Sequence, residues 1–277
     1  MSLDFVLKPT APDSFSTSID RAIVLGAKAD RLGYAFFGGY TSAITALDPF
    51  ITGIGALCAT ESGGGHPRAI QTTLSGGVLN GEKHFVSGGK LADTLLVVAK
   101  VGEKDGRPDL KVARISAKAS GVAVEQGAPL DFVPEIPHGS VTFRDAKVEA
   151  VLEGDGYEKY LKPFRTIEDL HVFAAILSCL IANGRTAFPQ SITEQLLAVL
   201  AAIQTLGRDN PSSPSVHLAL AGVLTWARSL IDGLDLSKLD PEFRARFERD
   251  RPLLQIAGKV REARRTKAWE SFQGPRG

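Results

Sequence analysis

The chain has 277 residues, of which 44% are hydrophobic and 23% are charged. These proportions are typical of a globular protein and exclude a largely disordered chain. Thirty-two basic residues oppose 31 acidic ones, so the net charge of +1 indicates neither a nucleic-acid partner nor an acidic membrane surface. Cys58 and Cys179 lie far apart, which excludes a disulfide framework and a cysteine-rich zinc site. We therefore expect a reduced, cytoplasmic protein, and the first residues do not resemble a signal peptide.

The first part of the chain, residues 1–52, is predicted to be helical. Either Ser16 or Ser18 is a candidate N-cap for a helix with apolar residues at helical spacing: Ile19, Ala22, Ile23, Ala27 and Leu32. A second apolar stretch follows at 35–47, and Pro49 helps to end it.

Residues 53–152 change to glycine clusters and short β-rich runs. Their length and spacing predict an antiparallel sandwich or barrel. The predicted strands are 69–74, 83–87, 94–101, 110–115, 122–124 and 140–143. Asn80-Gly81 predicts a hairpin turn, because these residue types tolerate the positive φ of a type I′ turn.

Residues 153–277 have the apolar periodicity of helices. The predicted helices are 157–164, 167–185, 191–206, 215–234, 241–249 and 252–272. The longest mostly apolar run, 170–182, falls short of the ~20 residues that span a bilayer, so we expect a buried helix and no membrane. The fold class predicted is α+β: a short N-terminal helical segment, a central β-domain and a C-terminal helical bundle.

A glycine-rich segment, 58–66, follows a predicted strand at 54–59. Its glycines allow backbone N–H groups to approach a ligand closely, although turn statistics alone favour a simple long turn. The segment has neither the Walker A nor the Rossmann pattern. The five histidines form no i,i+4 pair, which favours surface or core positions over metal ligation.

Six short segments follow one another between residues 55 and 157 in a recognisable order. They are GALCATESGGG (55–65), AIQTT (69–73), LNGEKHFVSGG (79–89), LADTLLVVA (91–99), VTFRDAKV (141–148) and GDGY (154–157). Each resembles a motif of the acyl-CoA dehydrogenase family, beginning with G-A-x-A-x-T-E-P-G-A-G-S-D and L-N-G-x-K-x-W-I-T-N-G. The resemblance implies a helical domain, a β-barrel-like domain and a four-helix C-terminal domain.

The resemblance also implies a cofactor, FAD, held between the β-domain and the C-terminal helices. In this family a carboxylate removes the α-proton of an acyl thioester while the β-hydrogen leaves as hydride to the flavin. Carried over residue by residue, the flavin contacts are Cys58, Ala59 and Thr60 at a strand end, Phe85 in place of the usual Trp, and Ser87 in place of Thr. The alternative for Phe85 is a strand core residue.

The chain departs from the family pattern on the substrate side. Ser62 replaces a proline, and Gly65-His66 replaces the Ser-Asp pair that contacts acyl-CoA. Gly65 and His66 are therefore the substrate-binding candidates, with a solvated loop as the alternative for His66. Arg208 is the nearest candidate for the family's phosphate-binding arginine, and helix-breaking residues surround it.

The catalytic base is the other departure. In most members a Glu follows a C-terminal loop, and this sequence stops where it resembles that loop. A minority place the base on an earlier helix that resembles 167–175; gapless counting favours Asp169, with Glu168 as the second candidate. The alternative for both is an acidic residue in the cap or first turn of a helix. The basic residues of 259–267 are expected to form a solvated helix face, with a phosphate contact as the alternative.

The resemblance implies an acyl-CoA dehydrogenase-like flavin oxidoreductase of fatty acid metabolism that acts on the CH–CH bond of an acyl-CoA or related thioester. An electron-transfer acceptor is implied as a partner. The shortened helical domains would expose apolar helix faces, which predicts a homo-oligomer. The alternative is a divergent, catalytically inactive member that acts as a binding or interaction protein.

Overall fold

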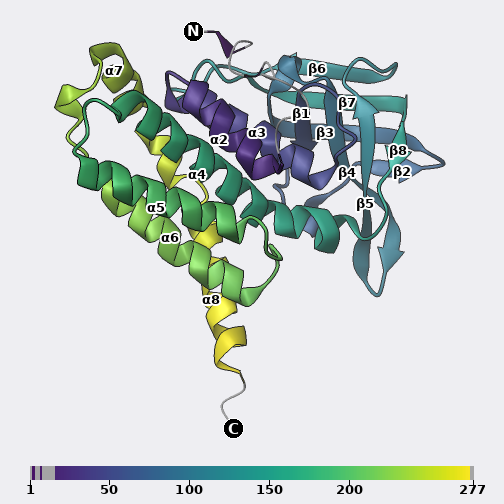
Figure 1. Cartoon of the computed structure of the whole chain (residues 1–277). Coiled ribbons are helices and arrows are strands. Elements are labelled where there is room, and N and C mark those ends of the chain that lie inside the picture. The colour runs from purple at the N-terminus through teal and green to yellow at the C-terminus, as the bar shows by residue number, and fades with distance from the viewer. Residues whose placement is uncertain (1, 4–6, 8–15, 275–277) are drawn as a thin grey trace. The chain divides into compact units, whose positions relative to one another are not determined.

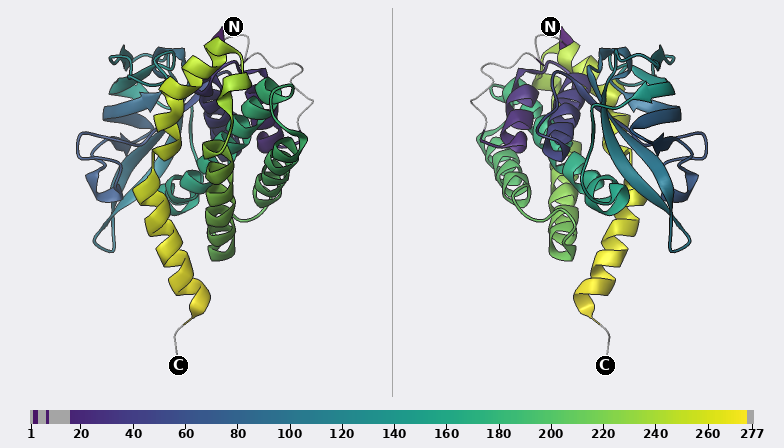
Figure 2. Two further views of the ribbon diagram at one scale, coloured as in Figure 1. Left: turned by 90° about the vertical axis from the view of Figure 1, so that its left-hand side faces the viewer. Right: turned by 90° about the vertical axis from the view of Figure 1, so that its right-hand side faces the viewer.

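The computed structural model describes residues 2–3, 7 and 16–274, and its contacts divide the chain into two compact units. Unit 1 comprises Met1–Ala43, Asp131–Val133 and Thr166–Gly277, and unit 2 comprises Ile44–Leu130 and Pro134–Arg165. Unit 1 is helical and unit 2 is built around a β-sheet (Figures 1 and 2). The predicted α+β class, with helices before and after the strands, is confirmed.

Unit 2 contains one eight-stranded sheet. Its strands are β1 (Gly55–Cys58), β2 (Thr73–Ser75), β3 (Val78–Ser87), β4 (Thr94–Lys104), β5 (Arg107–Ser116), β6 (Val122–Gln126), β7 (His138–Lys147) and β8 (Ala150–Val151). The order is β6-β7-β3-β2-β4-β5-β8, with β1 also paired to β4. Because β1 and β2 pair with β4 in parallel, the sheet is mixed, not purely antiparallel as the strand pattern predicted.

The hydrophobic core of unit 2 lies on the sheet around β4. Residues 94–99 are all buried, as expected of a central strand whose two faces are both covered. Buried residues from other strands, including Ala56, Leu79, Ile115 and Phe143, join Val97 in this core. The ends of β1 and β3 therefore belong to a sheet that is supported by this hydrophobic core.

The hairpin turn between β2 and β3 is formed by Gly76 and Gly77, whose φ angles are 56° and 77°. The prediction of a turn at Asn80-Gly81 is wrong, because both residues lie within β3. Gly81 is required there for a close approach: a Cβ on it would lie 2.6 Å from Thr72 Oγ1. The predicted strand 69–74 is also mostly wrong, since only its last two residues belong to β2.

Unit 1 is a set of packed helices. They are α2 (Ser18–Lys28), α3 (Leu32–Leu47), α4 (Lys162–Gly184), α5 (Gln190–Leu206), α6 (Pro214–Asp232), α7 (Pro241–Asp250) and α8 (Gly258–Gln273). The first residues of α4 and the last of α3 belong to unit 2. Helix α6 packs against both α5 and α8. The predicted helices at 191–206, 215–234 and 241–249 are confirmed within two residues at each end.

Two helix boundaries differ from the prediction. Thr17, and neither Ser16 nor Ser18, is the N-cap of α2, since its side chain accepts a hydrogen bond from the Asp20 amide. The predicted helix 252–272 is interrupted, because Ala257 has a φ of 63°, and α8 begins only after it.

Helix α4 is the central helix of unit 1. A Cβ on Gly26 would lie 2.1 Å from the Ala175 carbonyl oxygen, so glycine allows α2 to lie directly against α4. The segment Gly156–Gly184 is long and apolar enough to cross a membrane by composition, and 72% of its most apolar window is buried within the protein. This burial is that of a core helix, as the sequence predicted for 170–182.

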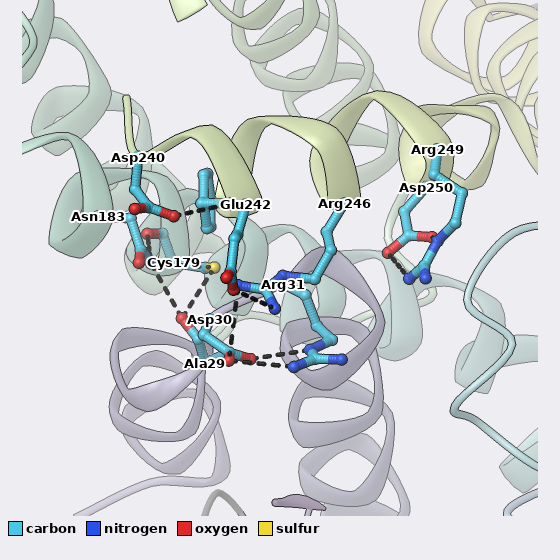
Figure 3. A network of polar contacts seen from close by, with 11 residues as sticks. Ala29, Asp30, Arg31, Cys179, Asn183, Asp240, Glu242, Arg246, Arg249 and Asp250 are labelled. Atoms are coloured by element: carbon cyan, nitrogen blue, oxygen red, sulfur yellow. Dashed lines mark hydrogen bonds and ion pairs between the residues drawn. The ribbon is translucent and has the colours of Figure 1, made fainter. Parts of the chain in front are cut away.

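A polar network fixes the turn after α2 (Figure 3). The carbonyl oxygen of Ala29 accepts hydrogen bonds from Asn183 Nδ2 at 2.9 Å and from Cys179 Sγ at 3.3 Å. Next to it, Asp30 lies 4.0 Å from Arg246 of α7. The network therefore joins the α2–α3 turn to the end of α4 and to α7.

Candidate functional site

The segment directly after β1 is joined to β3 by a backbone hydrogen bond. The amide of His84 donates to the Thr60 carbonyl oxygen at 2.8 Å. Between Lys83 and Val86 the pairing of β3 with β7 shifts register, which marks a β-bulge. Phe85 directly follows His84, so this hydrogen bond joins the two segments that carry the predicted flavin contacts Thr60 and Phe85.

Phe85 is the most unusual residue of this region. Its φ is 53°, and its side chain is 78% exposed. A bulky aromatic residue in the left-handed region is an outlier that costs on the order of 1–3 kcal/mol. Because the ring is exposed, the alternative of a strand core residue is wrong.

Two hydroxyl groups belong to the same two segments. Thr60 and Ser87 are half-buried, and within the described part of the chain neither side chain makes a hydrogen bond. Half-buried hydroxyls without partners are available to a ligand. Both residues stood among the predicted cofactor contacts.

Cys58 lies at the end of β1 with its side chain fully buried. Burial raises the pKa of its thiol to about 12, against a smaller opposing effect of Lys83. The thiol is therefore neutral and points into the core. Any contact of Cys58 with a ligand would come from its backbone, and half-buried Ala59 follows it toward the surface.

A buried ion pair supports the site, and sequence reasoning did not single it out. Lys83 Nζ lies 2.6 Å from Glu61 Oε1, and the Glu61 carboxylate also accepts from the amides of Gln71 and Thr72 at 2.7 and 3.0 Å. Burial alone would raise the pKa of Glu61, but the Lys83 hydrogen bond and the two amides lower it overall. Burial lowers the pKa of Lys83. Glu61 and Lys83 both lie within segments that resemble motifs of the acyl-CoA dehydrogenase family. Their place in these motifs could have identified them from the sequence.

The glycine-rich loop begins as a tight turn. Glu61 and Gly64 exchange two backbone hydrogen bonds of 3.2 and 2.8 Å, and Gly64 has a φ of 96°. The turn interpretation therefore holds for 61–64. His66 follows as an exposed residue whose Nδ1 accepts from the Arg68 amide at 3.2 Å and caps the 3₁₀ turn Pro67–Ala69.

His66 also lines a pocket of about 670 Å³ in unit 2. This volume falls within the range of small-molecule sites. The pocket lies between the 3₁₀ turn, the β4–β5 hairpin and the segment around Tyr157. Its charged lining residues are Arg68, Lys104, Asp105, Arg107, Asp109, Asp155 and Glu158. Cations and carboxylates are both present, and Gly65 is not among the lining residues.

Asp169 lies inside α4, where two arginines of α8 hold its carboxylate. Arg261 Nε donates to Oδ1 at 2.8 Å, and Arg264 NH2 donates to Oδ2 at 2.6 Å. Because α4 begins at Lys162, the cap or first-turn interpretation is wrong. The solvated face predicted for 259–267 is wrong at Arg261 and Arg264, whose side chains are only 15% and 14% exposed.

Asp169 and its half-buried neighbour Glu168 belong to unit 1, whereas Thr60, Phe85 and Ser87 belong to unit 2. Arg208 is exposed. Among the residues that the structure describes, no group of three His, Cys, Asp or Glu side chains is arranged to bind a metal ion.

Comparisons with known proteins add evidence on the fold. No protein-family model and no curated protein matches this chain. The FAD complex of PigA aligns with a TM-score of 0.65 at 16% identity, over 98% of this chain and 87% of its own.

Two further solved structures align over most of the chain. Butyryl-CoA dehydrogenase from Megasphaera elsdenii has a TM-score of 0.61 at 17% identity, over 93% of this chain and 83% of its own. Acyl-CoA dehydrogenase from Geobacillus kaustophilus has a TM-score of 0.60 at 15% identity, over 98% and 90%. At identities this low, the structural alignments show a shared fold alone.

Proposed function

We propose that this chain, which has the acyl-CoA dehydrogenase fold, binds FAD and acts as a flavin oxidoreductase on the CH–CH bond of an acyl thioester. One observation carries the proposal: the β-bulge of β3 has an exposed aromatic ring, Phe85, and the two segments joined there also carry the unpartnered hydroxyls of Thr60 and Ser87.

These residues fit the ring system of a flavin. An isoalloxazine has two apolar faces and a polar edge of nitrogen and oxygen atoms. Phe85 would cover one face, since aromatic rings stack in offset geometry. The Thr60 and Ser87 hydroxyls would donate hydrogen bonds to the edge, and the Ala59 backbone would line it. When bound, FAD would supply the acceptor for the hydride that leaves the β-carbon.

The pocket beside His66 is the proposed entrance for the thioester and its carrier. Arg68, Lys104 and Arg107 offer cations to phosphate groups, and Tyr157 offers an aromatic surface. Gly65 and His66, as the residues that continue the glycine loop to this pocket, remain the proposed substrate contacts. Acyl-CoA is accordingly the first substrate to test.

Asp169 and Glu168 remain the proposed bases that take the α-proton. For Asp169, however, Arg261 and Arg264 already bind the two carboxylate oxygens at 2.6–2.8 Å. This structural use of the carboxylate favours a second candidate function: a protein that binds flavin without dehydrogenating a thioester. An electron-transfer acceptor and a second copy of the chain are the partners proposed for the active enzyme.

The two candidates are separated by anaerobic mixing of the FAD-loaded protein with butyryl-CoA. Dehydrogenation transfers one proton to the base and one hydride to the flavin, so the visible flavin absorbance falls. We expect bleaching in the wild-type protein and its loss in either Asp169→Asn or Glu168→Gln, with the exposed-acid variant Asp232→Asn as control. Flavin that stays bound and is not bleached by acyl-CoAs of any chain length would contradict dehydrogenation and support the second candidate.

A further inference from the structure

Arg228 of α6 has a buried polar atom with no partner. No hydrogen-bond acceptor lies near its Nε in the part of the chain that the structure describes. The rest of the side chain is half-buried and reaches solvent. Buried donors are almost always paired, so an unpaired one singles out Arg228 as a donor that can bind an acceptor from outside the chain.

The guanidinium groups of Arg228 and Arg261 lie against the same aromatic ring. Their central carbons are 5.7 and 5.4 Å from the centre of Phe173, which is itself buried. Contact with a fixed ring restricts the orientation of a guanidinium group. Arg261 is also an electrostatic neighbour of Arg228, so two restricted cations lie near each other and can attract one oxygen-bearing ligand.

This cluster has more positive than negative charge. Arg228, Arg261 and Arg264 surround one carboxylate, Asp169, whose two oxygens are already bound by Arg261 and Arg264. Asp232 is also an electrostatic neighbour of Arg228, but its Oδ1 lies 2.6 Å from Arg251. Burial first, and the Arg261 charge second, lower the pKa of Arg228 below its usual value. Arg228 therefore has no carboxylate of its own.

Arg246 of α7 shows the contrast. Its Nε is likewise buried without a partner, but its other nitrogens lie 3.4 Å from Glu242 and 4.0 Å from Asp30 (Figure 3). At Arg246 the protein supplies the anions, whereas at Arg228 an anion is lacking.

We propose that Arg228, assisted by Arg261, binds a small oxyanion, either a carboxylate or a phosphate, over the ring of Phe173. Arg228 supplies most of the donors, because Arg261 already uses Nε and NH2 on Asp169 and NH1 on the Ile256 carbonyl oxygen. A planar fork of N–H groups matches two oxygens of either anion. The site lies within unit 1 and needs no flavin.

The test is calorimetric titration of the full-length protein with inorganic phosphate and, separately, with succinate, at constant ionic strength maintained with sodium chloride. We expect one of the two anions to bind one per chain, and the tighter one identifies the ligand class. Arg228→Met should weaken that binding by about tenfold or more, because charge-assisted hydrogen bonds are lost. Arg265→Met, an exposed arginine of α8 paired with Glu262, should leave it unchanged.

Thermal unfolding supplies a second readout. In chloride alone Arg228→Met should unfold at the same temperature as the wild type or higher, since no hydrogen-bond or ion-pair partner is lost and methionine can still pack on Phe173. In saturating anion the wild type should be the more stable. Binding of neither anion, equal binding by Arg228→Met, or a lower unfolding temperature of this variant in chloride would each overturn the proposal. FAD titration of the same variant should be unaffected, so this proposal and the flavin function fail separately.

Discussion

Lys83 Nζ lies 2.6 Å from Glu61 Oε1, both side chains are buried, and the β-bulge that carries Phe85 begins at Lys83. Removing one partner of a buried pair leaves an uncompensated charge and costs about 3–5 kcal/mol. We expect Lys83→Met to lower the free energy of unfolding by about this amount in urea titrations. The control Lys100→Met, in an exposed pair with Glu103, should cost less than about 1 kcal/mol.

The double variant Lys83→Met/Glu61→Gln separates charge from shape. Because it removes both buried charges, it should recover part of the stability that the single variant loses. A double variant less stable than either single variant would contradict this account of the pair.

Asp169 is expected to contribute strongly to stability, because Arg261 and Arg264 would lose their shared anion in Asp169→Asn. The loss should be about 3 kcal/mol in the free energy of unfolding. Asp232→Asn, which removes an exposed partner of Arg251, should cost less than about 1 kcal/mol. Equal effects of the two substitutions would show that the contacts of Asp169 with α8 are not maintained in solution.

His171 makes stability depend on pH. Burial lowers its pKa to about 4, against the opposing hydrogen bond to the Ile167 carbonyl oxygen, and Nε2 lies 2.8 Å from Ser18 Oγ. Between the ordinary pKa of 6.5 and about 4, the unfolded chain takes up a proton that the folded chain does not. Stability is therefore complete above pH 6.5 and falls by up to about 3 kcal/mol as the pH drops through this window.

His171→Asn should flatten that decline when unfolding is measured by urea at a series of pH values. The exposed-histidine variant His66→Asn should keep the wild-type slope. If the slope survives in His171→Asn, another group is responsible for it.

The end of α8 predicts self-association. Trp269 and Phe272 are 43% and 63% exposed, and their rings meet edge to face at 5.7 Å. Adjacent exposed aromatic residues are typical of interfaces. Light scattering should give a multiple of the monomer mass for the wild type and a smaller mass for Trp269→Glu, whereas Phe50→Glu in unit 2 should not alter it. A monomeric wild type would contradict the predicted homo-oligomer.

The order of the motifs and the apolar patterns along the chain predicted the fold well, because these signals are distributed over many residues. The apolar spacing within α5 and within α6 predicts a helix at each place. The β-rich run of β4 predicts a strand. Local signals were less reliable where tertiary contacts decided: Asn80-Gly81 reads as a turn, but Gly81 serves the close approach of Thr72.

The candidate site was predictable only in part, because tertiary contacts decide its geometry. Motif order singled out Thr60, Phe85 and Ser87 as candidates, but the bulge at Phe85 depends on pairing with β7, which starts more than fifty residues later. The arginines that bind Asp169 come from α8, 92 and 95 positions along the chain. No local pattern encodes such contacts.

The most direct test of the proposed flavin site is titration of purified protein with FAD, followed by quenching of flavin fluorescence. We predict saturable binding that is weakened about tenfold or more in Thr60→Val/Ser87→Ala and in Phe85→Ala, and is unchanged in the matched surface variants Thr73→Val and Phe50→Ala. An absence of quenching by the wild-type protein, or equal binding by all the variants, would contradict the account.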